Sequence, residues 1–319
     1  MVTLLSRLVR GLQTSRTGLS RIEKFARCAA LFPVFSLLVL ILRLRAMRGK
    51  PPMDVVAQTS DGMRFRCRPP DLIQMYIWLF GVWEPELTAF IASRLAPGDG
   101  FLDVGANIGY FSVLAARRVG MTGSVVSVEP SPSVFPLLEE NMRLNGGGRD
   151  AGIRLVNAAA GRDVGSMPIY SGPAHNIGLT TTVAERGFQL EGVVSSLPLD
   201  DMLRPEEMGA LRMIKIDVEG REPDVLRGME QLIGNSREDL ELVIELSPDW
   251  WTDPDLTVTE VIQPFLDAGF NIYEIRNSYW PWRYLWPQSV SRPRRRRSRL
   301  PRRAERLDFI FSRRDVEVL

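Results

Sequence analysis

The sequence contains little cysteine, and this shortage excludes one class of fold. Its 319 residues include only two cysteines, Cys28 and Cys67. Two cysteines cannot form the set of bridges that holds a small disulfide-rich domain together. They suit a reducing compartment, and we expect each to be a buried thiol. The chain is 45% hydrophobic, so it can instead bury one large core.

The uncharged apolar stretch near the N-terminus is shorter than a membrane-spanning helix needs. It runs for 15 residues from Cys28 to Leu42, whereas spanning a membrane takes about 20 apolar residues. No small-residue cleavage site follows it, so we do not expect a cleaved signal peptide. Two interpretations stay open. One is a helix that lies in or dips into a membrane, held by Arg43, Arg45, Arg48 and Lys50, and the other is a helix packed on the body of the protein.

The net charge of +2 is small, but it is unevenly distributed. Residues 1–50 carry ten Lys and Arg against one acid, and residues 291–314 carry eleven Arg against two acids, so each segment has a charge of +9. The remaining residues therefore sum to −16. We expect the two basic segments, and not the acidic body, to meet anionic surfaces.

The second basic segment contains an arginine-rich loop, Ser291–Arg303, with the sequence SRPRRRRSRLPRR. It can be a solvated mobile loop, or it can contact lipid head groups or nucleic acid phosphates. Lipid is favoured over nucleic acid because the other basic segment adjoins an apolar helix. Because aromatic residues precede the loop, nucleic acid binding stays an alternative, and the same residues also suit a membrane interface. They are Tyr279, Trp280, Trp282, Tyr284 and Trp286.

From about residue 55, segments typical of strands alternate with segments typical of helices. This alternation predicts an α/β fold with a mostly parallel, seven-stranded sheet and helices on both faces. The last two strands have no helix between them, so we expect the last one to run antiparallel. Residues 1–50 are then a basic N-terminal helical segment, and residues 51–319 form one domain. The expected strands are 101–104, 124–128, 153–158, 213–216, 240–246, 271–275 and 307–311, and the expected helices are 108–119, 133–144, 223–233 and 258–268.

The stretch FLDVGANIGYFS, residues 101–112, is typical of a strand that turns at glycine into a helix. Gly105 and Gly109 allow a tight turn, and the helix start offers N–H groups to an anion. Asp103 would repel a pyrophosphate, whereas it suits an ammonium group. Glu129 ends the next strand, where nucleotide sites hold a ribose diol. S-adenosylmethionine fits all of these features, although NAD sites share the acid after the second strand and NAD therefore stays an alternative.

Several ordered motifs resemble the FkbM family of methyltransferases over about residues 80–250. They include the DVGANIG turn, VVSVEPSPSVFPLLEENMRLN, HNIGLTTT, LPLDDML, IKIDVEGREPDVLRGM and LVIELSP. The resemblance implies a class I methyltransferase fold of the Rossmann-like kind, with S-adenosylmethionine as cofactor and O-methylation of a sugar, polyketide or related hydroxyl. It maps Asp103, Gly105, Asn107 and Gly109 to the cofactor turn, and Glu129 to the ribose, followed by Pro130 and Ser131. It also implies that Asn157 to Ala159 approach the adenine edge.

Three carboxylates lie at the ends of the expected strands 213–216 and 240–246 and are candidates for the reacting centre. Asp217 and Glu219 lie in IKIDVEG, and Glu245 ends LVIEL. Together they could hold a Mg²⁺ ion that orients and acidifies a hydroxyl, or one of them could accept its proton directly. A structural interpretation competes, in which Lys215 pairs with a carboxylate and Glu219 caps the following helix.

The sole histidine, His175, is a second candidate for the base, since histidine titrates near neutral pH. It lies in HNIGLTTT, which borders the acceptor site in the resembled family, and the alternative is a histidine on a surface loop.

These patterns favour an S-adenosylmethionine-dependent methyltransferase that acts on a glycan, lipid-linked or natural-product hydroxyl. We expect it in the cytoplasm, peripheral at the inner face of the cell membrane through its basic segments. The alternatives are an RNA methyltransferase that uses the arginine-rich loop, and a cofactor-binding, membrane-anchored scaffold without turnover.

Overall fold

The computed structural model describes residues 2–12, 20–146, 152–173, 175–184, 187–285, 290–298, 300–301, 304 and 306–319. The chain divides into two compact units. The smaller unit comprises Met1–Pro85, Ala174–Gly178 and Asn277–Val290, and the larger comprises Glu86–Pro173, Leu179–Arg276 and Ser291–Leu319. The expected division at residue 50 stays a prediction.

The larger unit is built on a sheet of eight strands in the order β12-β11-β13-β10-β9-β3-β4-β5. Five of them run parallel: β3, β4, β5, β9 and β10 pair side by side in that direction. The strands are β3 (Gly100–Val104), β4 (Ser124–Val128), β5 (Ile153–Val156), β9 (Leu211–Ile216), β10 (Glu241–Leu246), β11 (Asn271–Glu274), β12 (Arg294–Arg295) and β13 (Leu307–Ser312).

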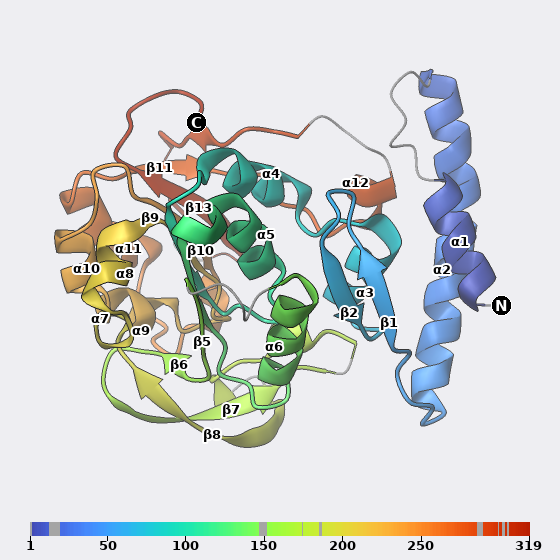
Figure 1. Cartoon of the computed structure of the whole chain (residues 1–319), viewed down its shortest axis with the longest axis horizontal. Helices are drawn as coiled ribbons and strands as arrows, with labels where there is room; N and C mark the ends of the chain where they lie inside the picture. Colours follow the sequence, from blue (N-terminus) through green and yellow to red (C-terminus); the bar gives the residue numbers. More distant parts are fainter. Residues whose placement is uncertain are drawn as a thin grey trace. The chain divides into compact units, whose positions relative to one another are not determined.

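Helices cover both faces of this sheet, as predicted. Figure 1 shows α5 (Tyr110–Val119) and α6 (Phe135–Leu144) on one face, with α9 (Glu222–Arg227), α10 (Glu230–Gly234) and α11 (Val258–Asp267) on the other. Because both faces are covered, the central strands are apolar throughout: Leu102, Ile214 and Ile244 are fully buried. Burying each such side chain stabilises the fold by roughly 1.5–3 kcal/mol. Short helices α4 (Pro85–Arg94), α7 (Leu199–Met202) and α8 (Pro205–Ala210) complete the unit.

The last strand, β13, runs antiparallel to both of its neighbours, β10 and β11, as expected. The sheet nevertheless has one strand more than the seven expected, since part of the arginine-rich loop forms β12 against β11. A second, three-stranded sheet in the order β6-β8-β7 was not expected from the sequence. Its strands are β6 (Ala159–Ala160), β7 (Gly165–Ser171) and β8 (Gln189–Leu197).

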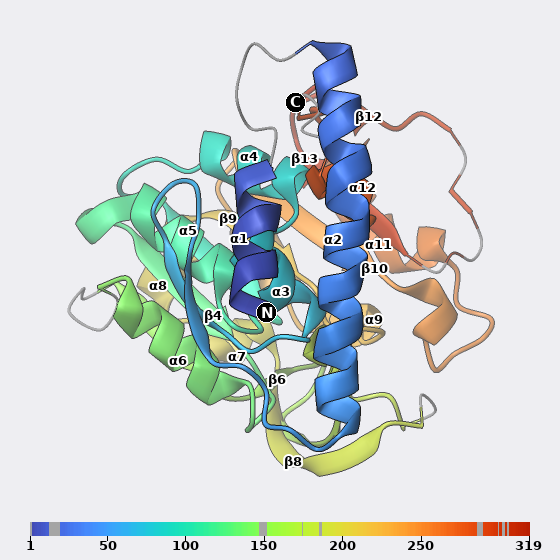
Figure 2. The same ribbon diagram turned by 90° about the vertical axis from the view of Figure 1, so that its right-hand side faces the viewer.

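The smaller unit contains a helix hairpin and a strand hairpin. Helix α1 (Val2–Leu12) lies beside α2 (Arg21–Met47) in Figure 2. Strands β1 (Val55–Gln58) and β2 (Arg64–Cys67) pair antiparallel, and α3 (Leu72–Phe80) packs on them. Helix α12 (Pro281–Leu285) is the last element of the unit. Both cysteines are buried thiols outside any disulfide, as expected.

Helix α2 is longer than the uncharged stretch of 15 residues indicated. It has 27 residues, begins with a capping box between Ser20 and Glu23, and includes Arg27 and Arg43 in its interior. Arginine is a good helix former, so the charges that bound the stretch do not end the helix. The window Phe25–Met47, with 23 residues and a mean hydropathy of 2.3, is long and apolar enough to cross a membrane by composition.

Candidate functional site

The turn after β3 can be formed only with glycine at two positions. Gly105 has φ +78°, and a Cβ there would lie 1.8 Å from the carbonyl oxygen of Asp217. Gly109 has φ +86°, and its Cβ would lie 2.5 Å from Leu138 Cδ1. The turn therefore packs directly on the end of β9 and on α6. A backbone contact requires glycine at position 105, and the left-handed φ favours glycine at position 109, before any ligand is considered.

The ribose-acid candidate Glu129 lies at the end of β4 and holds the turn in place. Its Oε2 accepts a hydrogen bond from the N–H of Asn107 at 2.8 Å, and its Oε1 accepts one from the N–H of Ser131 at 2.9 Å. Asn107 adopts a left-handed conformation, with φ +50°. Burial raises the pKa of Glu129 to about 7. Each carboxylate oxygen has about two acceptor directions, so one on each oxygen remains for a vicinal diol.

The N–H groups of the turn are used by the protein itself. Those of Gly105 and Ala106 donate to Val128 O, that of Asn107 to Glu129, that of Ile108 to Asn107 Oδ1, and that of Gly109 to Ala106 O. The turn residues that we expected to bind a ligand's carboxylate are therefore already satisfied. An anion at this turn has to be bound by donors at the start of α5, where a helix leaves its first N–H groups without helical partners.

Asp103 is buried at the end of β3 and lies between a serine and a lysine. Its Oδ2 accepts a hydrogen bond from Ser112 Oγ at 2.6 Å, and its Oδ1 lies 4.0 Å from Lys215 Nζ. Burial raises the pKa of Asp103, and Lys215 opposes that rise. Its Oδ1 has no hydrogen-bond donor in the described part of the chain. A buried oxygen without a hydrogen bond is costly, and the Lys215 ammonium at 4.0 Å does not supply one, whereas the ammonium group of a ligand could.

The remaining cofactor candidates brace the loop after β4. Asn157 Nδ2 donates to the carbonyl oxygens of Glu129 at 2.8 Å and Pro130 at 3.2 Å. Ala159 is buried in a small cluster with Ile169 and Val194. Their approach to an adenine ring stays a prediction.

Sequence reasoning missed Glu191, which lies in β8 and braces the same loop. It accepts hydrogen bonds from Ser131 Oγ at 2.9 Å, from the N–H of Ser133 at 2.8 Å and from Ser171 Oγ at 2.9 Å. These bonds lower the pKa of Glu191 although its burial opposes them. No local signal could have found it, because its partners lie 20 to 60 residues away in the chain.

The three predicted carboxylates meet at the carboxyl edge of the sheet. Asp217, Glu219 and Glu245 each offer one oxygen, and these oxygens lie within 4.8 Å of one another. Burial and the neighbouring acids Asp217, Asp308 and Glu219 raise the pKa of Glu245 well above its ordinary range. Three carboxylates this close cannot all ionise without cost, so the cluster retains a proton more readily than isolated carboxylates.

Lys215 has the pairing role that the structural alternative gave it, whereas Glu219 does not cap the next helix. Lys215 Nζ does pair with Asp217 Oδ2, at 3.1 Å, so it links the cofactor turn to the carboxylate cluster. Helix α9 begins at Glu222 with Arg221 as its N-cap, so Glu219 is not the cap. Instead Glu219 adopts φ +54°, which is uncommon for a residue with a side chain. Strained positions of this kind concentrate at functional sites.

The segment HNIGLTTT contributes to the site through its threonines. Thr181 Oγ1 donates to the carbonyl oxygen of Glu219 at 2.7 Å, and Arg221 Nε donates to Thr182 Oγ1 at 3.1 Å. His175 belongs to the smaller unit, where its side chain is exposed and its carbonyl oxygen accepts the N–H of Leu72. Its role as a base stays a prediction.

The residues present fit S-adenosylmethionine on two independent observations. Glu129 retains acceptor directions for a diol, and Asp103 has a buried oxygen that lacks a donor. The acidic cluster beside them suits a positively charged sulfonium.

Comparisons with known proteins agree with this geometry. A model of the methyltransferase FkbM domain matches residues 103–272, which is more than half of the chain. The chain is 25% identical over 216 residues to methyltransferase sdnD of Sordaria araneosa, covering 58% of this chain and 79% of that one. It is 24% identical over 153 residues to methyltransferase 1 of Beauveria bassiana, covering 42% of this chain and 60% of that one. It thus matches less than two thirds of that second relative.

A third relative and a solved structure have lower identity. Hexuronic acid methyltransferase AglP of Haloferax volcanii is 23% identical over 148 residues, which is 46% of this chain and 56% of that one. An O-methyltransferase of Thermotoga maritima is 16% identical with a TM-score of 0.38, covering 86% of this chain and 83% of that one. The sheet order, the glycine turn and the family match lead to one conclusion: the chain belongs to the FkbM-domain family and is an S-adenosylmethionine-dependent methyltransferase.

Proposed function

We propose that the enzyme methylates a hydroxyl oxygen of a glycan, lipid-linked or natural-product acceptor. The observation that supports this most is the convergence of Asp217, Glu219 and Glu245 beside the cofactor turn. A hydroxyl loses its proton as it becomes an ether, and a carboxylate is a suitable acceptor for that proton. The name of the relative AglP refers to a hexuronic acid, which is a sugar acceptor.

Bound S-adenosylmethionine supplies an electrophilic methyl group on its sulfonium. The chain's own residues have to orient the acceptor oxygen and take up its proton. Glu245 is the best candidate for the proton acceptor, since its pKa is raised by burial and by Asp217. A raised pKa makes the ionised form of a carboxylate a stronger base. Lys215 holds Asp217 in place at 3.1 Å and so positions the cluster.

The test is transfer of labelled methyl groups from S-adenosylmethionine to glycolipid, RNA and small-molecule fractions of the source cells. We expect label in a glycan or lipid-linked species. Glu245→Gln and Asp217→Asn should each lower turnover by roughly 10²–10⁴-fold, while the affinity for S-adenosylhomocysteine stays within a few-fold of wild type. Unchanged turnover in both variants would remove the cluster from the reaction, and label confined to RNA would overturn the acceptor class.

A Mg²⁺ ion is an alternative partner for the carboxylate cluster. Oxygens within 4.8 Å of one another suit a small divalent cation, which would orient and acidify the hydroxyl. Full activity after exhaustive chelation would argue for the metal-free arrangement. The metal would be favoured if chelation removed the activity, if added Mg²⁺ restored it, and if the Glu219→Gln variant showed no such restoration.

We further propose that the enzyme works at the cytoplasmic membrane surface through α2. One face of α2 is buried within its own unit, at Cys28, Leu31, Phe35, Leu38 and Leu42, whereas the other face is apolar and exposed. Phe25, Leu37 and Leu40 are 69%, 46% and 53% exposed. A helix that is apolar on all sides is either buried or in contact with lipid. The basic residues Arg43 and Arg45 near its C-terminal end, and Arg48 and Lys50 just after it, would interact with anionic head groups.

Flotation of the full chain with anionic vesicles tests this attachment. The wild type should float, and a Leu37→Lys/Leu40→Lys variant should float much less. Val193→Lys changes a valine that is 66% exposed in the larger unit and serves as the matched control. Wild-type protein that stays with the soluble fraction at low and high salt would overturn the proposal.

A further inference from the structure

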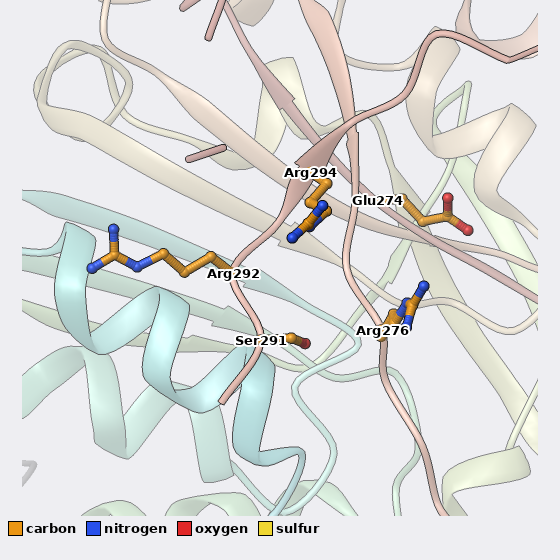
Figure 3. A pocket seen from close by; sticks show the side chains of 5 residues that line it. All are labelled: Glu274, Arg276, Ser291, Arg292 and Arg294. Carbon is orange, nitrogen blue, oxygen red and sulfur yellow. The ribbon is translucent and has the colours of Figure 1, made fainter. Parts of the chain in front are cut away.

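A cavity of about 440 Å³ lies between the end of β11 and the chain that leads into β12. Its lining consists of Glu274, Arg276, Ser291, Arg292 and Arg294. Figure 3 shows that these residues come from two neighbouring segments of the larger unit. A volume of a few hundred Å³ is typical of sites for small molecules or head groups.

The cavity has an excess of positive charge. Other arginines of the loop are paired: Arg295 with Asp315 at 3.2 Å, Arg296 with Glu274 at 3.0 Å and Arg297 with Glu317 at 3.5 Å. The only acid in the lining, Glu274, is therefore already engaged. Arg276, Arg292 and Arg294 are exposed and have no ion-pair partner within the described ranges. Figure 3 shows the Arg292 side chain extending away from those of Arg276 and Arg294, so an anion in the cavity would be attracted mainly by the guanidinium groups of Arg276 and Arg294.

The cavity lies at the same edge of the sheet as the carboxylate cluster. Strand β11 is antiparallel to β13, which is antiparallel to β10, so β11 and β10 end at the same edge. Glu245 pairs with Asp308, and the N–H of Ile275 donates to the carbonyl oxygen of Asp308. The backbone at Ile275 is thus two strand spacings, or about 10 Å, from that at Glu245. Arg276 is the next residue.

We propose that this arginine cavity binds a diphosphate group of the acceptor, a role that rests on the proposed function. Guanidinium forks match phosphate oxygens in pairs, and a lining with more than one arginine that lacks an acidic partner favours a multivalent anion over a single carboxylate. Because the backbones at Ile275 and Glu245 are about two strand spacings apart, an anion bound at Arg276 would lie at the same edge of the sheet as the carboxylate cluster. An extended nucleic acid would require a long basic groove with stacking aromatics, whereas the lining of this site consists of five residues without an aromatic side chain.

Calorimetry on the full chain with inorganic pyrophosphate tests the cavity without turnover. The wild type should bind, and Arg276→Gln/Arg294→Gln should weaken binding by at least about tenfold, with a smaller salt dependence. The matched control is Arg297→Gln, because Arg297 is paired with Glu317, both side chains are about 70% exposed, and it is outside the lining. Affinity for S-adenosylhomocysteine, measured in parallel, should be unchanged in all variants.

Two further binding experiments identify the source of the diphosphate. Binding of uridine diphosphate would indicate a soluble nucleotide-linked acceptor, and selective binding to vesicles that contain a polyprenyl diphosphate would indicate a lipid-linked one. The proposal is overturned if pyrophosphate does not bind, if the double variant binds it as the wild type does, or if single-stranded RNA binds more tightly and is lost in the same variant. If the wild type did not bind S-adenosylhomocysteine, this result would instead contradict the methyltransferase function, whether or not the cavity binds pyrophosphate.

Discussion

Burial and hydrogen bonding act in opposite directions on the pKa of Glu129. Its two oxygens hold the N–H groups of Asn107 and Ser131, and its burial raises its pKa to about 7. A ribose diol donates hydrogen bonds, so it binds the ionised carboxylate best. Protonation of Glu129 should therefore compete with the cofactor below pH 7.

We predict that S-adenosylhomocysteine binds up to about tenfold more weakly at pH 6 than at pH 8, because protons compete for a group of pKa about 7. Glu129→Gln should bind roughly 10- to 100-fold more weakly, since hydrogen bonds to a charged group contribute about 1.5–3 kcal/mol. The pH dependence should also flatten in this variant. Calorimetry at pH 6, 7 and 8 measures both effects, and a wild-type affinity that is constant over this range would contradict the assignment.

Gly105 is a second position where one residue decides the site. A Cβ at Gly105 would lie 1.8 Å from the carbonyl oxygen of Asp217, and φ there is +78°. Gly105→Ala should thus lower the free energy of unfolding by at least about 2–4 kcal/mol, combining left-handed strain and overpacking. Gly165→Ala is the control, because Gly165 has open space and no left-handed φ. Thermal denaturation compares the two, and equal midpoints would refute the steric argument.

At the scale of elements, β8 supports the loop after β4 through Glu191. This carboxylate holds Ser131 and Ser133 while Glu129 holds the N–H of Ser131. The loop after β4 is therefore positioned by a strand of the second sheet. That sheet was missed from the sequence because its strands are mostly polar or partly exposed, as in the buried and exposed pattern of β8, and so lack the apolar alternation of a half-buried strand.

We predict that Glu191→Ala weakens the binding of S-adenosylhomocysteine several-fold and raises the KM for the cofactor, with a smaller effect on kcat. The cause is a mobile loop after β4 rather than a lost ligand contact. Glu191→Gln should rescue part of the effect, since its amide oxygen can still accept a hydrogen bond from Ser133. A reduced kcat with an unchanged KM would show that Glu191 does not position this loop.

At the scale of the whole molecule, several buried carboxylates make stability depend on pH. Burial raises the pKa values of both Glu129 and Glu222 to about 7 from an ordinary 4.5. The folded protein therefore binds more protons than the unfolded chain between these values. The stability contributed by protonation is complete below about pH 4.5 and is lost as the pH rises to about 7, at about 3 kcal/mol for each group.

We predict that the ligand-free protein is less stable at pH 8 than at pH 6, by about 2–3 kcal/mol from these two groups together. Glu222→Gln should reduce this difference by about half, since its carboxamide does not titrate. Chemical denaturation at both pH values measures the change. S-adenosylhomocysteine should stabilise the protein more at pH 8 than at pH 6, because it binds ionised Glu129. Higher stability at pH 8 without ligand would contradict these pKa directions.

The sequence by itself determined the class of fold, the antiparallel last strand and the identity of the glycine turn. These features depend on local apolar runs and on the left-handed conformations of Gly105 and Gly109. Both signals are local, so they can be read from the order of residues along the chain. It also determined that Asp217, Glu219 and Glu245 would meet, because parallel strands end at one edge of a sheet. The uncharged stretch indicated a helix shorter than α2, because Arg27 and Arg43 bound the stretch but do not end the helix.

Only the tertiary structure decided how these groups are charged and connected. Whether Glu245 is raised in pKa, whether Lys215 links Asp103 to Asp217, and whether Glu191 reaches Ser131 all depend on distances between segments far apart in the chain. The same holds for the arginines: three of the loop's paired arginines meet acids in β11 and near the C-terminus, while Arg276, Arg292 and Arg294 surround a cavity. Electrostatic energy depends on separation and burial in space, and neither quantity is written in local sequence order.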